Sequence, residues 1–165
     1  MPFEVRASCP EERDEILDVT DAAFERTSRE FFETAWRLDP NDAPELHRVG
    51  VLDGRIVSAA RIVRKTVRVG CAELTLGGIA DVATHPDFRG RGYATEVLND
   101  CLRYMDASGY HLSMLFTGLQ AFYRRLGWEV FPTYHHLFHL LPNLQPPLTL
   151  PLSKGEMEGV SAGWK

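Results

Sequence analysis

The feature that most constrains the fold is a glycine-rich turn at residues 89–94, which lies between an expected strand and the most regular helix pattern in the chain. The segment 79–84 before the turn is apolar and ends because proline at position 86 forbids further strand pairing. After Gly92, apolar residues recur on one helical face until Gly109: Ala94, Val97, Leu98, Cys101, Leu102 and Met105. The sequence therefore predicts a strand, a tight turn and a helix in direct succession.

The rest of the chain predicts an α+β domain built on one central mixed, mostly antiparallel sheet with about four helices. Two helices, at about 10–24 and 28–37, follow a first strand at 3–7. The hairpin signal Asp53-Gly54 joins strands 47–52 and 56–69, and a strand at 72–76 follows. Gly77 and Gly78 are expected to separate that strand from 79–84. The C-terminal half adds a strand at 111–116, a short helix at 119–126 closed by Gly127, and strands at 128–131 and 134–141. We expect one domain over 1–141 and a proline- and glycine-containing tail over 142–165.

Charge and composition exclude several classes of protein. The formal net charge is -5, with 13 acidic and 6 basic residues in 1–48, so the basic field typical of a nucleic-acid-binding protein is missing. No run of 18 apolar residues predicts a membrane span, and the N-terminus has no secretory pattern. Three widely spaced cysteines predict neither a disulfide framework nor a zinc site. We expect a cytoplasmic protein with no nucleic-acid, membrane or metal partner.

The glycine-rich turn has the chemistry of a phosphate site. Unpaired N–H groups at a helix N-terminus favour an anion, and Gly90 and Gly92 let the backbone approach a diphosphate closely. Arg89 and Arg91 add positive charge. A P-loop is excluded because no Gly-Lys-Ser or Gly-Lys-Thr occurs, and a dinucleotide fingerprint is disfavoured because Thr95 stands where its third glycine belongs.

Three motifs in order resemble those of the GNAT N-acetyltransferases. Arg89, Gly92 and Ala94 match the coenzyme A signature [Q/R]-x-x-G-x-[G/A], preceded by VATHP at 82–86 and followed by FYRRLGW at 122–128. The likeness covers about 3–141, and it is greatest to the N-terminal catalytic domain of Eis-like acetyltransferases. Those proteins are much longer, with a second GNAT-like region and a sterol-carrier-like domain, and they carry a serine where this chain has Gly118.

This resemblance implies a GNAT-like fold, acetyl-CoA as co-substrate and specific roles for individual residues. Backbone N–H groups of the turn would hold the pyrophosphate: those of Gly90, Arg91, Gly92, Tyr93, Ala94 and Thr95. The strand edge at Val82, Ala83 and Thr84 would pair with the pantetheine amides, and Thr117 would lie near the thioester. Tyr123 would protonate the leaving thiolate, a transfer that its phenol can make as charge builds on sulfur.

The base that deprotonates the amine is left open among Asp81, His85, a water held by either, and acidic residues of the first two helices. If strand alternation holds, Asp81 shares a face with Ile79 and Ala83 and is partly buried, so its carboxylate is either paired or functional.

Aromatic side chains on the first two helices are either core or one wall of the acceptor pocket: Phe24, Phe31, Phe32 and Trp36. Their acidic surroundings would suit a cationic amine. His135, His136 and His139 are disfavoured as metal ligands, because on a strand the middle histidine faces away from the other two.

The resemblance predicts an enzyme that moves acetyl from acetyl-CoA to a primary amine of a small molecule by direct attack in a ternary complex. None of the cysteines lies in a motif, so an acyl-cysteine route has no support. Two alternatives stay open: a non-catalytic acyl-CoA-binding module, and an acetyltransferase acting on protein lysines or N-termini. The oligomeric state is also open, a homo-oligomer included.

Overall fold

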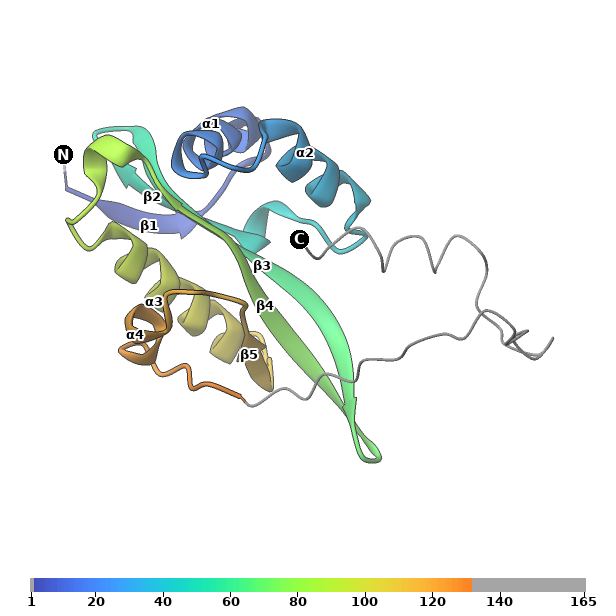
Figure 1. Cartoon of the computed structure of the whole chain (residues 1–165). Coiled ribbons are helices and arrows are strands. Elements are labelled where there is room, and N and C mark those ends of the chain that lie inside the picture. Colours follow the sequence, from blue (N-terminus) through green and yellow to red (C-terminus); the bar gives the residue numbers. More distant parts are fainter. Residues whose placement is uncertain (1, 132–165) are drawn as a thin grey trace, which may run out of the picture. The chain divides into compact units, whose positions relative to one another are not determined.

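A computed structural model describes residues 2–131 of the chain, and the predicted strand 134–141 and the tail 142–165 lie outside the described residues. The described part up to Val130 forms one compact unit (Figure 1). Its helices and strands are, in chain order, β1 (Glu4–Ala7), the 3-10 helix η1 (Pro10–Glu12), α1 (Arg13–Ala23), α2 (Arg29–Leu38), the 3-10 helix η2 (Pro44–Leu46), β2 (His47–Leu52), β3 (Arg55–Val69), β4 (Ala72–Thr84), the 3-10 helix η3 (Pro86–Phe88), α3 (Tyr93–Ala107), β5 (Leu112–Met114) and α4 (Gln120–Arg124).

The strands form a single sheet in the order β1-β2-β3-β4-β5. Neighbours from β1 to β4 pair antiparallel, whereas β5 pairs parallel to β4. Helices α1 and α2 lie on one face of the sheet, and α3 and α4 lie on the other (Figure 1). The mixed, mostly antiparallel sheet and its four α-helices confirm the predicted α+β class.

The core consists of two layers separated by the sheet. The layer under α1 and α2 contains Ile16, Leu17, Phe32, Trp36, Val49, Ala59 and Ala83. The layer under α3 contains Ala60, Ile62, Ile79, Val97, Leu98, Cys101 and Met105. Neighbouring residues Ala59 and Ala60 belong to different layers because successive strand residues point to opposite faces. Each fully buried aliphatic or aromatic side chain contributes about 1.5–3 kcal/mol to folding.

The expected break in the strand at Gly77 and Gly78 is wrong. β4 runs continuously from Ala72 to Thr84, and both glycines pair with β3, Gly77 with Arg64 and Gly78 with Val63. A Cβ built on Gly77 would collide with the Met105 side chain of α3. Glycine in this strand therefore marks close approach of a neighbouring side chain rather than a chain break.

The predicted strand at 128–131 is also wrong, because the described chain after α4 has no strand there. Gly127 has a φ of 96°, the left-handed conformation expected for the end of the short helix. The indole Nε1 of Trp128 then donates to Ser113 Oγ of β5 at 3.2 Å, so a side chain rather than a ladder holds this segment to the sheet.

Helix lengths and compositions bear on membrane association. No helix among residues 2–131 combines the length and the apolar character needed to cross a membrane.

Candidate active site

The glycine-rich turn enters α3 through two left-handed residues. Gly90 has a φ of 77° and Gly92 a φ of 85°, and nothing lies within 4 Å of a Cβ built on either. Conformation, rather than lack of space, therefore requires glycine at both positions. Gly92 caps α3 without any side-chain hydrogen bond. The first N–H groups of this 15-residue helix are thus a positive end suited to an anion.

Within residues 2–131, the hydrogen bonds of the two turn arginines go to main-chain oxygens. Arg89 donates from Nη2 to the carbonyl of Ala23 at 3.0 Å, at the end of α1, and from Nε to that of Thr84 at 3.4 Å. Arg91 donates from Nη2 to the carbonyl of Asp87 at 3.3 Å. Because a carbonyl group carries no net charge, these hydrogen bonds do not neutralise the two arginines. Their positive charges therefore add to the anion-binding character of the turn.

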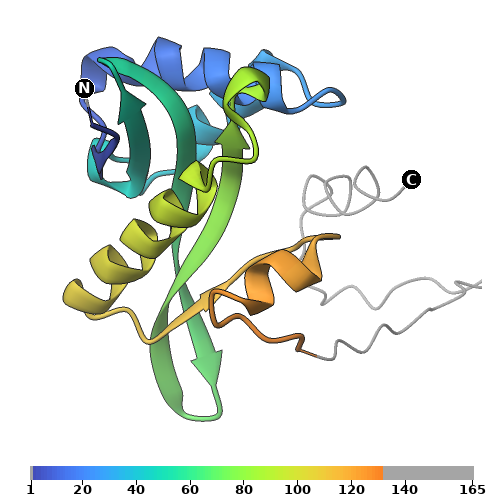
Figure 2. The same cartoon turned by 90° about the vertical axis from the view of Figure 1, so that its left-hand side faces the viewer.

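One edge of β4 is open immediately before the turn. β5 pairs with β4 only at three positions, Leu76, Gly77 and Gly78, and then diverges from it (Figure 2). No strand in the described part of the chain pairs with residues 79–84 on that side. The predicted pantetheine-binding residues at 82–84 lie within this open stretch, which leads directly to the N-terminus of α3.

A β-bulge interrupts this open stretch at Asp81. Arg61 of β3 pairs with Ala80, but Ala59 pairs with Ala83, so β4 holds one extra residue. Asp81 has a φ of 53°, which is uncommon for a residue other than glycine. The bulge overturns the expected alternation, because Ile79 lies in the α3 layer and Ala83 in the α1–α2 layer.

The Asp81 carboxylate is paired, which was one of the two alternatives open from the sequence. Its Oδ2 accepts hydrogen bonds from Trp36 Nε1 of α2 and from Arg61 Nε of β3, both at 2.8 Å. Arg61 also donates from Nη1 to Asp39 Oδ2 at 3.4 Å. The side chains are 13% exposed for Asp81 and 8% for Arg61, so these charges interact with little solvent screening.

Sequence reasoning missed Arg61 and Asp39. The available signal was a charged residue inside the apolar strand segment 56–63, because a buried arginine needs anionic partners.

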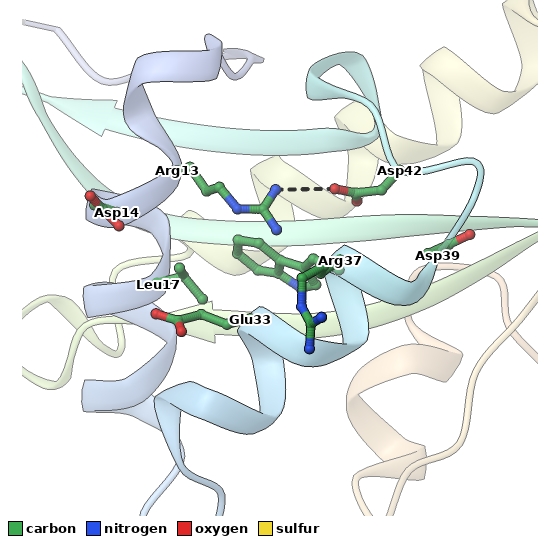
Figure 3. Close-up of a pocket in the computed structure, with 8 residues that line it drawn as sticks. Arg13, Asp14, Leu17, Glu33, Arg37, Asp39 and Asp42 are labelled. Carbon is green, nitrogen blue, oxygen red and sulfur yellow. Dashed lines mark hydrogen bonds and ion pairs between the residues drawn. The ribbon is translucent and has the colours of Figure 1, made fainter.

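A cavity of about 550 Å³ lies on the α1–α2 side, between these helices and the segment that follows α2 (Figure 3). Of the four aromatic residues proposed from the sequence as a pocket wall, Trp36 lines it, Phe32 is core, Phe24 packs beside the core and Phe31 is exposed. Most of the residues that line the cavity are charged: Arg13, Asp14, Leu17, Glu33, Trp36, Arg37, Asp39 and Asp42.

His47 lies beside this charged cluster and is almost completely buried. Its Nε2 is 2.7 Å from Asp42 Oδ1. Its ring packs edge-on against Trp36, with 4.5 Å between the ring centroids. Burial lowers the pKa of His47, Asp42 opposes this effect, and the positive charges of Arg61 and Arg13 lower the pKa further. The net result is an imidazole that is harder to protonate in the folded protein than in the unfolded chain.

We expect acid to destabilise the protein through His47. The unfolded chain protonates this histidine near its ordinary pKa of 6.5, whereas the folded protein does so only at lower pH. The unfolded state therefore binds more protons, and the free energy of unfolding falls as pH drops below that value. Urea unfolding between about pH 7.5 and pH 5.5 should show a smaller decrease for His47→Asn than for the wild type. Equal slopes in His47→Asn and the wild type would contradict the assignment.

Tyr123 lies on α4, packed against the α3 layer. Its ring packs edge-on against Phe122 and Trp128, with 5.0 Å and 5.9 Å between the ring centroids. Burial raises the pKa of Tyr123, so the phenol stays protonated at neutral pH. Val82 packs against the same layer, whereas Asp81 contacts Trp36 on the opposite face.

Two other residues considered from the sequence have local roles. Thr117 Oγ1 accepts a hydrogen bond from the Leu119 N–H at 2.9 Å, just before α4. His85 Nδ1 accepts from the Asp87 N–H at 3.3 Å, at the start of η3. Among residues 2–131, no three His, Cys, Asp or Glu side chains are arranged to hold a metal ion, and the histidines at 135, 136 and 139 lie outside the described residues.

Comparison with protein families matches residues 4–131 to the model of the acetyltransferase (GNAT) domain. No match to this sequence is found among the curated proteins.

Solved structures share the fold. A GNAT family acetyltransferase from Brucella melitensis in complex with acetyl-CoA is 24% identical, with a TM-score of 0.67 over 78% of this chain and 84% of that chain. A GCN5-related N-acetyltransferase from Kribbella flavida is 25% identical, with a TM-score of 0.66 over 76% of this chain and 32% of that chain. A protein from Enterococcus faecalis V583 is 23% identical, with a TM-score of 0.67 over 78% of this chain. The chain spans about a third of the length of the last two proteins.

Proposed function

The chain belongs to the GNAT acetyltransferase family, and from this premise we propose that it is an enzyme that transfers acetyl from acetyl-CoA to a primary amine of a small molecule. The observation that carries the proposal is the open edge of β4, which η3 and the glycine-rich turn connect to an N-terminus of α3 that has no side-chain cap. A ligand that consists of an extended arm with amide groups and a diphosphate at one end matches that surface. The Brucella neighbour with acetyl-CoA supports this choice of co-substrate.

Binding of acetyl-CoA would use main-chain groups at both ends of this surface. N–H groups of residues 90–95 would bind the pyrophosphate, and Arg89 and Arg91 would add charge-assisted contacts. The pantetheine amides would pair with the edge of β4 at 82–84, in the way that a peptide adds a strand to an exposed sheet edge. The thioester would then lie beyond Val82, with Thr117 near it.

The proposed reaction is direct attack in a ternary complex. The neutral amine nitrogen bonds to the thioester carbonyl carbon, and the resulting tetrahedral intermediate breaks its carbon–sulfur bond. Asp81 accepts the proton lost by the amine, and Tyr123 donates its phenolic proton to the departing sulfur. The two residues contact opposite faces of the sheet, so the acid and the base would lie on either side of the open edge. His85 or a bound water remains the alternative base.

A cationic acceptor fits the charge of the α1–α2 side. Asp39 and Asp42 line the cavity there, and Asp81 lies next to them through the shared Arg61. A carboxylate-rich wall attracts an ammonium group and raises its local concentration. This favours small polyamines and aminoglycosides over neutral arylamines.

Within the family, we propose that the closest relationship is to the catalytic domain of Eis-like acetyltransferases. The supporting segments are GGIADVATHPDFRGRGYAT and LFTGLQAFYRRLGWE, which include the turn and the Tyr123 motif. The limited share of the Kribbella chain that this protein covers agrees with a family whose members add further domains. The catalytic domain would extend over 1–141, with 142–165 as a tail.

The proposal is tested by measuring free-thiol release from acetyl-CoA with a panel of polyamines, aminoglycosides, arylamines and short peptides, alongside calorimetric titration with CoA. Turnover with a small amine is the expected result. Turnover with peptides alone would favour a protein acetyltransferase. Tight CoA binding without turnover would favour a non-catalytic acyl-CoA-binding module, and absence of CoA binding would overturn the whole proposal.

A further inference from the structure

The bulge in β4 is tied to α2 by a hydrogen bond between two side chains far apart in sequence. Trp36 Nε1 donates to Asp81 Oδ2 at 2.8 Å, and the Trp36 ring is 1% exposed. A buried indole N–H normally finds a partner, but a carboxylate is a charged one, and such bonds are stronger than neutral ones. The contact therefore does more than satisfy the indole.

The second donor, Arg61, is shared between several carboxylates. Its Nε donates to Asp81 at 2.8 Å, while its Nη1 is 3.4 Å from Asp39 Oδ2 and 3.9 Å from Asp42 Oδ1. Asp42 also pairs with Arg13, at 3.2 Å, which keeps part of its charge satisfied elsewhere. Asp81 thus has two fixed donors on the same oxygen, from two different elements of the fold.

The position of this pair of donors matters because the Asp81 backbone is left-handed at the open edge of β4. A residue in that conformation costs free energy and persists only where its surroundings hold it. Trp36 and Arg61 supply those surroundings, one residue before Val82, whose backbone would meet the pantetheine. Two donors on one oxygen fix the orientation of the carboxylate.

We propose that Trp36 and Arg61 are positioning residues that fix the orientation of the Asp81 carboxylate toward the acceptor amine. The inference rests on the proposed function, since it assigns these residues to the same site. Trp36 also lines the cavity between α1 and α2, so the indole links the acceptor side of the molecule to the bulge. Neither residue touches the reacting atoms; both act through Asp81.

The test is the separate measurement of kcat and KM for an amine that the wild type acetylates. Trp36→Phe keeps a buried aromatic ring and removes one donor, so the carboxylate loses one of the two hydrogen bonds that fix its orientation. We expect kcat to fall by about tenfold, while the KM for the amine stays within about twofold.

Two further variants separate positioning from packing. Arg61→Lys keeps the positive charge among the carboxylates but loses the fixed Nε donor, so its kcat should also fall. Phe32→Leu removes packing from the same face of α2 without touching Asp81, and should lower stability while leaving kcat unchanged. Circular dichroism and thermal melting confirm that each variant is folded.

Each outcome has a distinct meaning. Folded Trp36→Phe and Arg61→Lys variants with an unchanged kcat would overturn the inference, and so would an equal loss of kcat in Phe32→Leu. A wild type that releases no thiol with any amine would instead remove the proposed function, and the inference with it.

Discussion

Replacing Tyr123 by phenylalanine is expected to lower kcat by about 100-fold or more, because a positioned general acid typically contributes that much to a proton transfer. Without the phenolic proton, the thiolate would have to leave as a bare anion or take a proton from water. Phenylalanine keeps the edge contacts of the ring with Phe122 and Trp128, so the fold and CoA affinity should stay unchanged. Steady-state kinetics and CoA calorimetry measure the two effects separately.

Tyr110 supplies the matched control. It is a second tyrosine whose pKa is raised by burial, and its ring centroid is 6.4 Å from that of Tyr104. It stands between α3 and β5, outside the α4 segment that carries Tyr123. Tyr110→Phe also removes one hydroxyl, but it should leave kcat at the wild-type value. Similar kinetics for the two variants would show that Tyr123 is not the acid.

Placing aspartate at Gly92 is expected to weaken CoA binding by about 100-fold or more. Aspartate tolerates the left-handed conformation better than most residues and is a good helix N-cap, so α3 should still form. Its carboxylate would stand where the pyrophosphate is proposed to bind, and two such charges about 4 Å apart repel by several kcal/mol near a protein surface. Titration calorimetry with CoA measures the loss.

The control for Gly92→Asp is the same substitution at Gly54. That glycine is also left-handed, with a φ of 77°, and nothing lies within 4 Å of a Cβ built on it. It belongs to the turn between β2 and β3, so Gly54→Asp should bind CoA with wild-type affinity. If Gly92→Asp binds CoA as tightly as Gly54→Asp does, the turn is not the pyrophosphate site.

Local patterns were enough to predict the strand, turn and helix around the glycines. The spacing of Val97, Leu98, Cys101 and Met105 identifies the buried face of α3, and all four are buried. Gly90, Gly92 and Gly127 mark left-handed positions that few other residues adopt. These features depend on the residues themselves and their near neighbours in sequence.

Features that depend on distant residues were not predictable in the same way. From the sequence, Gly77 predicts the end of a strand. In the folded protein a glycine is needed there because the Met105 side chain, far along the chain, lies where a Cβ would be. Strict alternation predicts that Asp81 shares a face with Ile79, and this prediction is wrong because the sequence does not indicate the β-bulge. The partners of Asp81, Trp36 and Arg61, come from α2 and β3 and meet only in the folded protein.

The three-residue pairing between β4 and β5 has an evolutionary consequence. In the proposed complex, the cofactor replaces the missing length of β5 and is recognised by main-chain groups at 82–84, which every amino acid other than proline provides. Side chains along this stretch can then change from one descendant to another without loss of the acetyl donor. Selection is left free to reshape the acceptor side, around α1 and α2, while the pantetheine-binding edge of β4 is inherited almost independently of its side chains.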